Sequence, residues 1–125
     1  MLGEYDAVSN IAVKNLDIAR TFYADTLGLK QVDAEGQELV VFQSGKSRIF
    51  VYRSQYAGTN KATAVTWVVG DRVDQLVPAL KAKGVKFEHY DMPGLTVKGD
   101  VHVGGKMKIA WFKDPDGNIL SVVSG

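Results

Sequence analysis

The sequence predicts an α+β fold made of two copies of a βαβββ unit within one domain, residues 1–125. Each half contains a helical apolar pattern that follows an alternating strand pattern and is closed by a glycine. Strand-like runs separated by short turn signals follow the first helix. The chain also repeats weakly at an offset of 56 residues, which places Val13 on Val69 and Gly28 on Gly84. We expect module one to cover residues 1–56 and module two to cover residues 62–125.

Module one begins with an alternating strand pattern over residues 7–13, after which Asn15 is placed to cap a helix. The helix is expected over residues 16–27 and should end at Gly28. Its apolar residues recur on one face, which should lie on a sheet: Leu16, Ala19, Phe22, Tyr23 and Leu27. Three strands are expected next, over residues 30–34, 38–43 and 48–53, because hairpin turn signals separate these β-rich runs.

Module two repeats this order, with Asp71 expected to cap a helix that ends at Gly84. Pro78 lies inside this helix and predicts a kink or a late helix start. A strand is expected over residues 85–90, and the last two over 107–112 and 119–123. The turn between those two contains Pro115, which fixes φ, and Gly117, which supplies a positive φ, so a hairpin is expected there.

The segment from Asp91 to Lys106 has no counterpart in module one. It is polar and contains four glycines, so we expect it to lack regular structure and to form a mobile flap.

Strand alternation assigns the two faces of the predicted sheet. One face is uniformly apolar, as a surface under helices should be: Ile11, Val13, Ile49, Val51, Val65, Trp67, Val69, Leu120 and Val122. The opposite face mixes polar, aromatic and small residues, as the lining of a ligand cavity does.

Composition excludes several classes of site. Lys plus Arg total 15 against 14 Asp plus Glu, with no run of like charge, so no nucleic-acid-binding surface is indicated. The chain has no cysteine, which removes disulfides, thiolate metal sites and cysteine nucleophiles. No signal-peptide pattern and no membrane-span pattern occur, so we expect no membrane association and a cytoplasmic location.

Two segments carry a family resemblance: Asn15–Tyr23 with Leu27-Gly28-Leu29, and Trp111–Asn118. Together with the repeat, they resemble the vicinal oxygen chelate superfamily, which includes glyoxalase I, ring-cleaving dioxygenases, fosfomycin-modifying transferases and bleomycin-resistance proteins. The resemblance spans essentially the whole chain. It implies an open, cup-shaped mixed sheet with helices on the outer face.

The resemblance also locates the positions where metal-dependent members carry His and Glu, which are the first and fourth strands of each unit. In this sequence these positions are Val8, Phe50, Ala64 and Ser121. A divalent metal needs three or four nitrogen or oxygen ligands, which this set does not supply. We therefore expect a member without the usual metal ligands and without a cofactor.

Candidate ligand-binding residues come from the mixed face and from the flap: Asn10, Arg48, Phe50, Tyr52, Thr66, Tyr90, Met92, His102 and Ser121. Arg48 either holds an anionic or planar ligand or lies exposed at the sheet rim. His89 and His102 either share a site or are unrelated strand-end and loop histidines.

Three functions remain open from the sequence. The first is a metal-independent binding protein of the bleomycin-resistance type, a homodimer that sequesters an aromatic or cationic small molecule in a cup at or near the subunit interface. The second is a lyase or isomerase that uses an unrecognised metal site, or acid/base groups among Glu88, Tyr90, Asp91 and His102. The third is an association domain whose cup is filled by its own side chains.

Overall fold

The computed structural model describes all residues from Met1 to Gly125 and contains two βαβββ modules. Module one contains η1 (Leu2–Glu4), β1 (Ser9–Val13), α1 (Leu16–Arg20), η2 (Thr21–Thr26), β2 (Lys30–Glu35), β3 (Leu39–Ser44) and β4 (Ser47–Arg53). Module two contains β5 (Thr63–Val68), η3 (Gly70–Arg72), α2 (Val73–Ala82), β6 (Phe87–Glu88), β7 (Thr96–Lys98), β8 (Val101–Gly104), β9 (Met107–Lys113) and β10 (Ile119–Val123). The predicted α+β class with two repeated units is confirmed.

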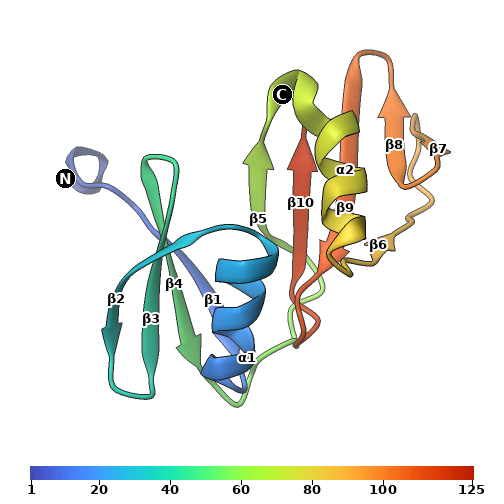
Figure 1. Cartoon of the computed structure of the whole chain (residues 1–125). Coiled ribbons are helices and arrows are strands. Elements are labelled where there is room, and N and C mark those ends of the chain that lie inside the picture. The colour runs from blue at the N-terminus through green and yellow to red at the C-terminus, as the bar shows by residue number, and fades with distance from the viewer.

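The strands form two mixed sheets that are not closed into a barrel. The first sheet has the order β1-β4-β3-β2, and the second has the order β5-β10-β9-β8-β7, with β6 also paired to β9. The first strand of each module pairs in parallel with the last, β1 with β4 and β5 with β10. Strands β1 and β5 are neighbours where the modules meet, and α1 and α2 lie on the same side of their sheets (Figure 1). We call this junction the seam, the helix-covered face of the sheets the outer face and the opposite one the inner face.

The first helix begins as predicted, because the Asn15 side chain accepts hydrogen bonds from the backbone N–H groups of Asp17 and Ile18 at 2.9 and 3.1 Å. Its second half is a π-helical turn rather than the predicted continuous α-helix, with the Leu27 N–H bonded to the Phe22 carbonyl. The π turn contains Tyr23, which is fully buried. Gly28 follows the helix with φ of 79°, as a helix-ending glycine does.

The second helix departs from the prediction at its start. Asp71 lies in the short turn η3 and does not cap α2, which begins at Val73 without a side-chain cap. Gly70 has φ of 61°, and the η3 turn that it opens delays the helix. A late start was one of the two adjustments expected because of Pro78. Pro78 itself lies inside α2.

The predicted irregular flap is wrong. Within residues 91–106 the chain forms the hairpin β7–β8, and β8 pairs with β9 as part of the second sheet. Gly99 has φ of 65° at the hairpin turn. A Cβ on Gly104 would lie 2.7 Å from the Gly94 carbonyl oxygen. The glycines therefore permit a turn and a close backbone approach rather than mobility.

The edge strand β2 is exposed along its whole length and carries charges at Lys30, Asp33 and Glu35. Its register with β3 shifts between Gln31 and Asp33, which leaves Val32 in a bulge.

One hydrophobic core extends through both modules on the outer face. The apolar residues assigned to that face by alternation are in it or packed against it, with Val13, Val51 and Leu120 all fully buried. This confirms the assignment of faces. No helix in the structure is long and apolar enough to cross a membrane.

The closing turn of module two is fastened to module one by a buried network around Asp114. The Asp114 carboxylate accepts hydrogen bonds from the Tyr23 hydroxyl at 2.6 Å and from the Asn118 side chain at 2.8 Å. It also accepts the backbone N–H groups of Asp116 and Asn118. The Asn118 amide additionally donates to the Ala12 carbonyl, and the Asp116 carboxylate accepts the Lys14 N–H. The turn thus contacts both β1 and the first helix.

We predict that Asp114→Ala lowers the free energy of unfolding by about 3 kcal/mol, because four donors lose a buried charged acceptor. Urea denaturation measures the change. Glu38→Ala is the control, since Glu38 pairs with Arg53 at the surface and should change stability by less than about 0.5 kcal/mol. Equal effects of the two substitutions would contradict a stabilising role for the turn.

The same network predicts an alkaline loss of stability. Burial and the neighbouring Asp114 carboxylate raise the pKa of Tyr23 well above its ordinary value. Above pH 10 the unfolded chain releases this proton while the folded chain keeps it, so stability falls there by about 1.4 kcal/mol per pH unit from this group. The stability advantage of the wild type over Tyr23→Phe should therefore be constant from about pH 7 to 9 and shrink above about pH 10. Denaturation at stepped pH measures it, and a constant gap up to about pH 11 would contradict the argument.

Candidate functional site

A pocket of about 330 Å³ lies on the inner face of module two. Side chains of β5, β9, β10 and the segment after β6 reach it because alternate residues of these strands point away from the helices. Its lining is mostly apolar and includes one cation, with the full set being Lys61, Ala62, Thr63, Tyr90, Met92, Trp111 and Ile119. Two of these, Tyr90 and Met92, were predicted as ligand-binding residues from the sequence.

The aromatic wall of the pocket is formed by Trp111 and Tyr90, whose rings meet edge to face at 5.3 Å. Trp111 is nearly buried, and its indole N–H donates to the Thr63 hydroxyl at 3.3 Å. The Tyr90 hydroxyl is buried without a hydrogen-bond partner. Burial and then the nearby Glu88 carboxylate raise the pKa of Tyr90, so its hydroxyl stays protonated at neutral pH. The hydroxyl is therefore an uncharged donor without a partner.

His102 lies behind this wall in β8, and not in a flap as the sequence suggested. It is fully buried, and its ring lies edge-on to Trp111 at 4.7 Å. Nε2 is 2.9 Å from the Tyr90 N–H and 3.1 Å from the Tyr90 carbonyl, while Nδ1 has no partner. His102 in β8 is thus bonded to the backbone of Tyr90, which follows β6. These hydrogen bonds fix the position of Tyr90 in the pocket wall.

The rings of His89 and His102 lie near each other, with centroids 6.2 Å apart. They do not share a partner, however. The His89 Nε2 pairs with Asp100 at 2.9 Å, and Lys81 pairs with the same carboxylate. The hydrogen bond from Lys81, followed by that from His89, lowers the pKa of Asp100. This cluster is an ionic contact between α2 and the β7–β8 hairpin.

Thr66 and Ser121 lie opposite each other on β5 and β10, and their hydroxyls are 2.8 Å apart. Ser121 is buried, whereas Thr66 is exposed. Because each hydroxyl serves the other, this pair is a polar patch on the inner face beside Trp111, which pairs with Ser121 across the sheet.

The remaining predicted residues lie on the inner face of module one. Asn10 and Phe50 are opposite each other on β1 and β4, and Tyr52 is two residues further along β4. Arg48 is exposed and pairs in register with Gln43. The structure therefore divides the predicted residues into a module-one group and a module-two group, and none of the module-one group lines the pocket.

The inner face does not fit a divalent metal ion. No group of three or more His, Cys, Asp or Glu side chains comes together in the structure. Ser121 and Thr66 are bonded to each other, and Phe50 has no ligand atom. Glu88, a carboxylate on this face opposite Trp111, pairs with Lys113 at 3.1 Å and raises the pKa of that lysine.

Sequence reasoning missed five of the pocket residues, which are Lys61, Ala62, Thr63, Trp111 and Ile119. Trp111 was used only as part of the closing motif, yet alternation places it on the inner face, because its neighbour Phe112 is buried under α2. The signal was available in the strand period. Nothing in the sequence indicated that the segment around Tyr90 lies against β9. That contact depends on the pairing of β8 with β9.

The chain matches the family model for the glyoxalase/bleomycin resistance protein/dioxygenase superfamily over residues 6–122. It belongs to that superfamily. The sequence-based resemblance is thereby confirmed. A search of curated proteins by sequence returns no match.

Solved structures of this superfamily share the fold. A glyoxalase family protein from Enterococcus faecalis aligns with a TM-score of 0.74 at 17% identity, covering 98% of this chain and 99% of that one. Lactoylglutathione lyase from Agrobacterium tumefaciens aligns with a TM-score of 0.71 at 21% identity, covering 95% and 92%. A fosfomycin resistance protein from Listeria monocytogenes, in complex with Mn(II) and sulfate, gives 0.71 at 16%, covering 100% and 92%. At these identities the likeness establishes the fold alone.

We predict that His102→Phe destabilises the protein by about 2 kcal/mol, because the Tyr90 N–H loses its acceptor. Hydrogen exchange at the Tyr90 amide, followed by NMR, should accelerate in the variant. His89→Phe is the control, since the half-exposed contact between His89 and Asp100 contributes less than about 1 kcal/mol. If the Tyr90 amide exchanges at the wild-type rate in His102→Phe, the bridging role is wrong.

Proposed function

We propose that this superfamily member is a metal-independent binding protein that holds a small aromatic or cationic molecule on its inner face. The observation that carries the proposal is the pocket walled by Trp111 and Tyr90 on a face without a cluster of metal ligands. Aromatic faces attract both planar rings and cations. Lys61 at the rim favours the aromatic class, particularly a ring with an anionic substituent. The proposal keeps the cytoplasmic location expected from the sequence.

The lining residues divide the work of binding. Trp111 and Tyr90 supply flat apolar area, and Met92 supplies an unbranched side chain, 40% exposed, that can adapt to the ligand shape. The unpartnered Tyr90 hydroxyl gives one directed hydrogen bond, since a buried donor without a partner is costly until an acceptor meets it.

Binding should be unaffected by metal. In a Trp67→Phe background, Trp111 is the remaining tryptophan, so its fluorescence reports the pocket. Titration with 1-naphthalenesulfonate, an anionic bicyclic aromatic, and with phenyltrimethylammonium, an aromatic cation, tests the ligand class. We expect saturable quenching that is the same in EDTA and in Mn(II), and about tenfold weaker in Tyr90→Ala, because the ring contributes about 1 kcal/mol or more.

The matched control is Tyr56→Ala, since Tyr56 is 67% exposed and outside the pocket. Its affinity should equal that of the parent. Binding that appears only when Mn(II) or another divalent ion is added would refute metal independence, and equal losses in both tyrosine variants would refute the site.

A second candidate is a lyase or isomerase with acid/base groups on the inner face. The specific observation that favours it is the protonated, unpartnered Tyr90 hydroxyl near the Glu88 carboxylate. Tyr90→Phe separates the two candidates. It retains the ring and should cost binding only the one hydrogen bond of the hydroxyl, about 1 kcal/mol, whereas acid catalysis by that hydroxyl should be lost. His102 is a weaker candidate for catalysis, since it is fully buried and bonded to the backbone.

We also propose a homodimer in which the inner face is covered by a second copy. Val68, Val123 and Ile109 lie side by side on this face, and Val68 is 71% exposed. An apolar row of this kind favours burial against another chain. In such a dimer the module-one group of Arg48, Phe50 and Tyr52 in one copy can approach the pocket of the other.

Val68→Asp should therefore shift the protein from dimer to monomer in sedimentation velocity, because an unpaired charge in an apolar interface is strongly unfavourable. Val32→Asp is the control, since Val32 is half as exposed and lies in the bulge of the outer edge strand. A wild type that sediments as a monomer at about 100 µM would contradict the dimer.

A further inference from the structure

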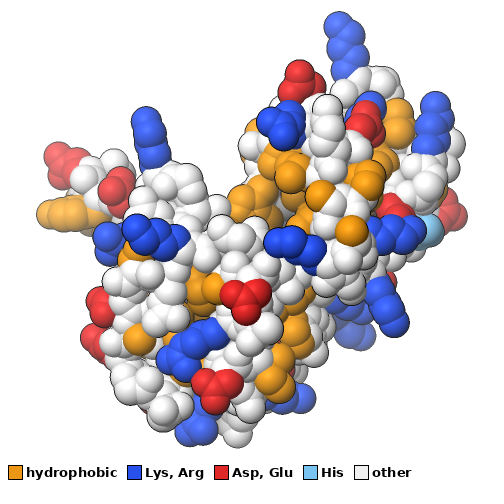
Figure 2. All heavy atoms as spheres, in the orientation of Figure 1, with side chains coloured by type: hydrophobic (Ala, Val, Ile, Leu, Met, Phe, Trp, Pro, Cys, Tyr) orange, Lys and Arg blue, Asp and Glu red, His pale blue; other side chains and the backbone are white.

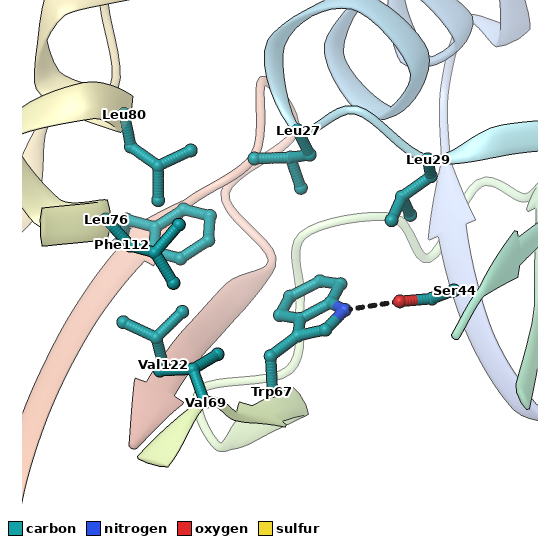
Figure 3. Close-up of a pocket in the computed structure, with 9 residues that line it drawn as sticks. All are labelled: Leu27, Leu29, Ser44, Trp67, Val69, Leu76, Leu80, Phe112 and Val122. Atoms are coloured by element: carbon teal, nitrogen blue, oxygen red, sulfur yellow. Dashed lines mark hydrogen bonds between the residues drawn. The ribbon is translucent and has the colours of Figure 1, made fainter. Parts of the chain in front are cut away.

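A second hollow, of about 200 Å³, lies on the outer face at the seam between the modules. In the space-filling view, hydrophobic side chains are visible between the lower-left and upper-right halves of the molecule (Figure 2). Leu27 and Leu29 line the hollow from module one, and Leu76 and Leu80 line it from α2 (Figure 3). Trp67 and Phe112 stand between these two groups of leucines. The inner-face pocket shares none of these residues.

The lining of this outer hollow is uncharged. Eight of its nine residues are hydrophobic, and the ninth is Ser44. The Trp67 indole N–H donates to the Ser44 hydroxyl at 2.8 Å, so the indole has no remaining polar group to satisfy. The Ser44 hydroxyl acts there as an acceptor and retains its own O–H to donate. A ligand would meet apolar surface and one hydroxyl donor.

Hydrogen bonds across the seam connect the two walls of the hollow and fix their relative position. The Trp67–Ser44 bond links β5 to the end of β3, and the Lys83 ammonium donates to the Asp25 carbonyl at 3.1 Å, joining the ends of the two helices. The backbone bond from Leu29 to Tyr23 fixes the chain after the first helix, where Leu27 and Leu29 project. The hollow is therefore built by both modules together.

The size of the hollow decides the kind of occupant. An α-helix with its side chains is about 10–12 Å across and does not fit, whereas an apolar cavity of about 150 Å³ holds one benzene ring. The rings of Trp67 and Phe112 are close to parallel, at 18°, and present flat surface. Flat walls without charge suit a flat, uncharged molecule.

We propose that the outer hollow is a second binding site, for an uncharged aromatic molecule of one or two rings that carries one hydrogen-bond acceptor. The acceptor oxygen of the ligand takes the Ser44 O–H, and its rings lie between the leucines and the Trp67–Phe112 wall. The site is independent of the inner-face pocket and of the function proposed for it.

The test uses 2-naphthol and naphthalene as probes and follows methyl signals of the full chain by NMR. Methyls of Leu27, Leu76 and Leu80 report the outer hollow, and the Met92 methyl reports the inner pocket. With 2-naphthol we expect saturable shifts of the leucine methyls, with a Kd below about 1 mM. Ser44→Ala removes the Trp67–Ser44 bond of the wall for both probes, but only 2-naphthol also loses its own hydrogen bond. The variant should therefore weaken 2-naphthol about fivefold more than naphthalene.

Leu76→Trp fills the hollow and should abolish the leucine shifts, whereas Leu2→Trp, at an 83% exposed position, should not. If Leu76→Trp fails to fold, the Ser44→Ala comparison decides alone. Leucine signals that do not shift up to the solubility limit of the probe overturn the proposal. The proposal is also overturned if the leucine signals shift when the protein is diluted but not when the probe is added. That result would mean that a second copy of the chain covers the hollow. A shift of the Met92 methyl alone overturns this site and leaves the inner-face proposal standing.

Discussion

The carboxylate of Asp114 accepts four hydrogen bonds in the interior, and the orientation of the two modules depends on them. It receives the Tyr23 hydroxyl from module one and both the backbone and the side chain of Asn118 from its own turn. Asn118 in turn donates to the Ala12 carbonyl in β1. A buried carboxylate is stable only when such donors surround it. Moreover, a Cβ on Gly58, in the connection between the modules, would lie 2.0 Å from the Asp116 carbonyl oxygen, so the connection packs directly on this turn.

Strand alternation gives the two faces of the second sheet different surfaces at neighbouring residues. Trp111 faces the inner pocket, and Phe112, the next residue along β9, faces the outer hollow. Likewise Thr66 and Val68 lie on the inner face, and Trp67 between them lies on the outer face. The two tryptophans of the chain therefore mark the two hollows. The inner one combines aromatic rings with Lys61 and an unpartnered hydroxyl, whereas the outer one is uncharged.

Local sequence signals predicted the local structure well. The Asn15 cap, the glycine at position 28 and the closing hairpin follow from short-range chemistry, and each is present. The division into two faces follows from the strand period, and the core confirms it. Asp71 looked like a cap from its position alone, but the turn that begins at Gly70 moved the helix start past it.

What the sequence could not predict depends on contacts between distant segments. The π turn coincides with the bond between Tyr23 and Asp114, which are 91 residues apart. Residues 91–106 read as irregular because their strands are short, and β9 supplies the partner that orders them. For the same reason His102, which the sequence placed in a flap, lies in β8 and is buried against Trp111 and the Tyr90 backbone.

The outer edge of the first sheet limits how copies of this protein can aggregate. Strand β2 carries charges of both signs along its length, and the bulge at Val32 interrupts the regular row of backbone donors and acceptors. A strand from another molecule that tried to extend the sheet there would meet mismatched backbone groups and solvated charges. At the other end of the second sheet, β7 is only three residues long. Edge-to-edge pairing of strands from different molecules is thus disfavoured at both β2 and β7. Contacts between copies are expected at the faces of the sheets instead.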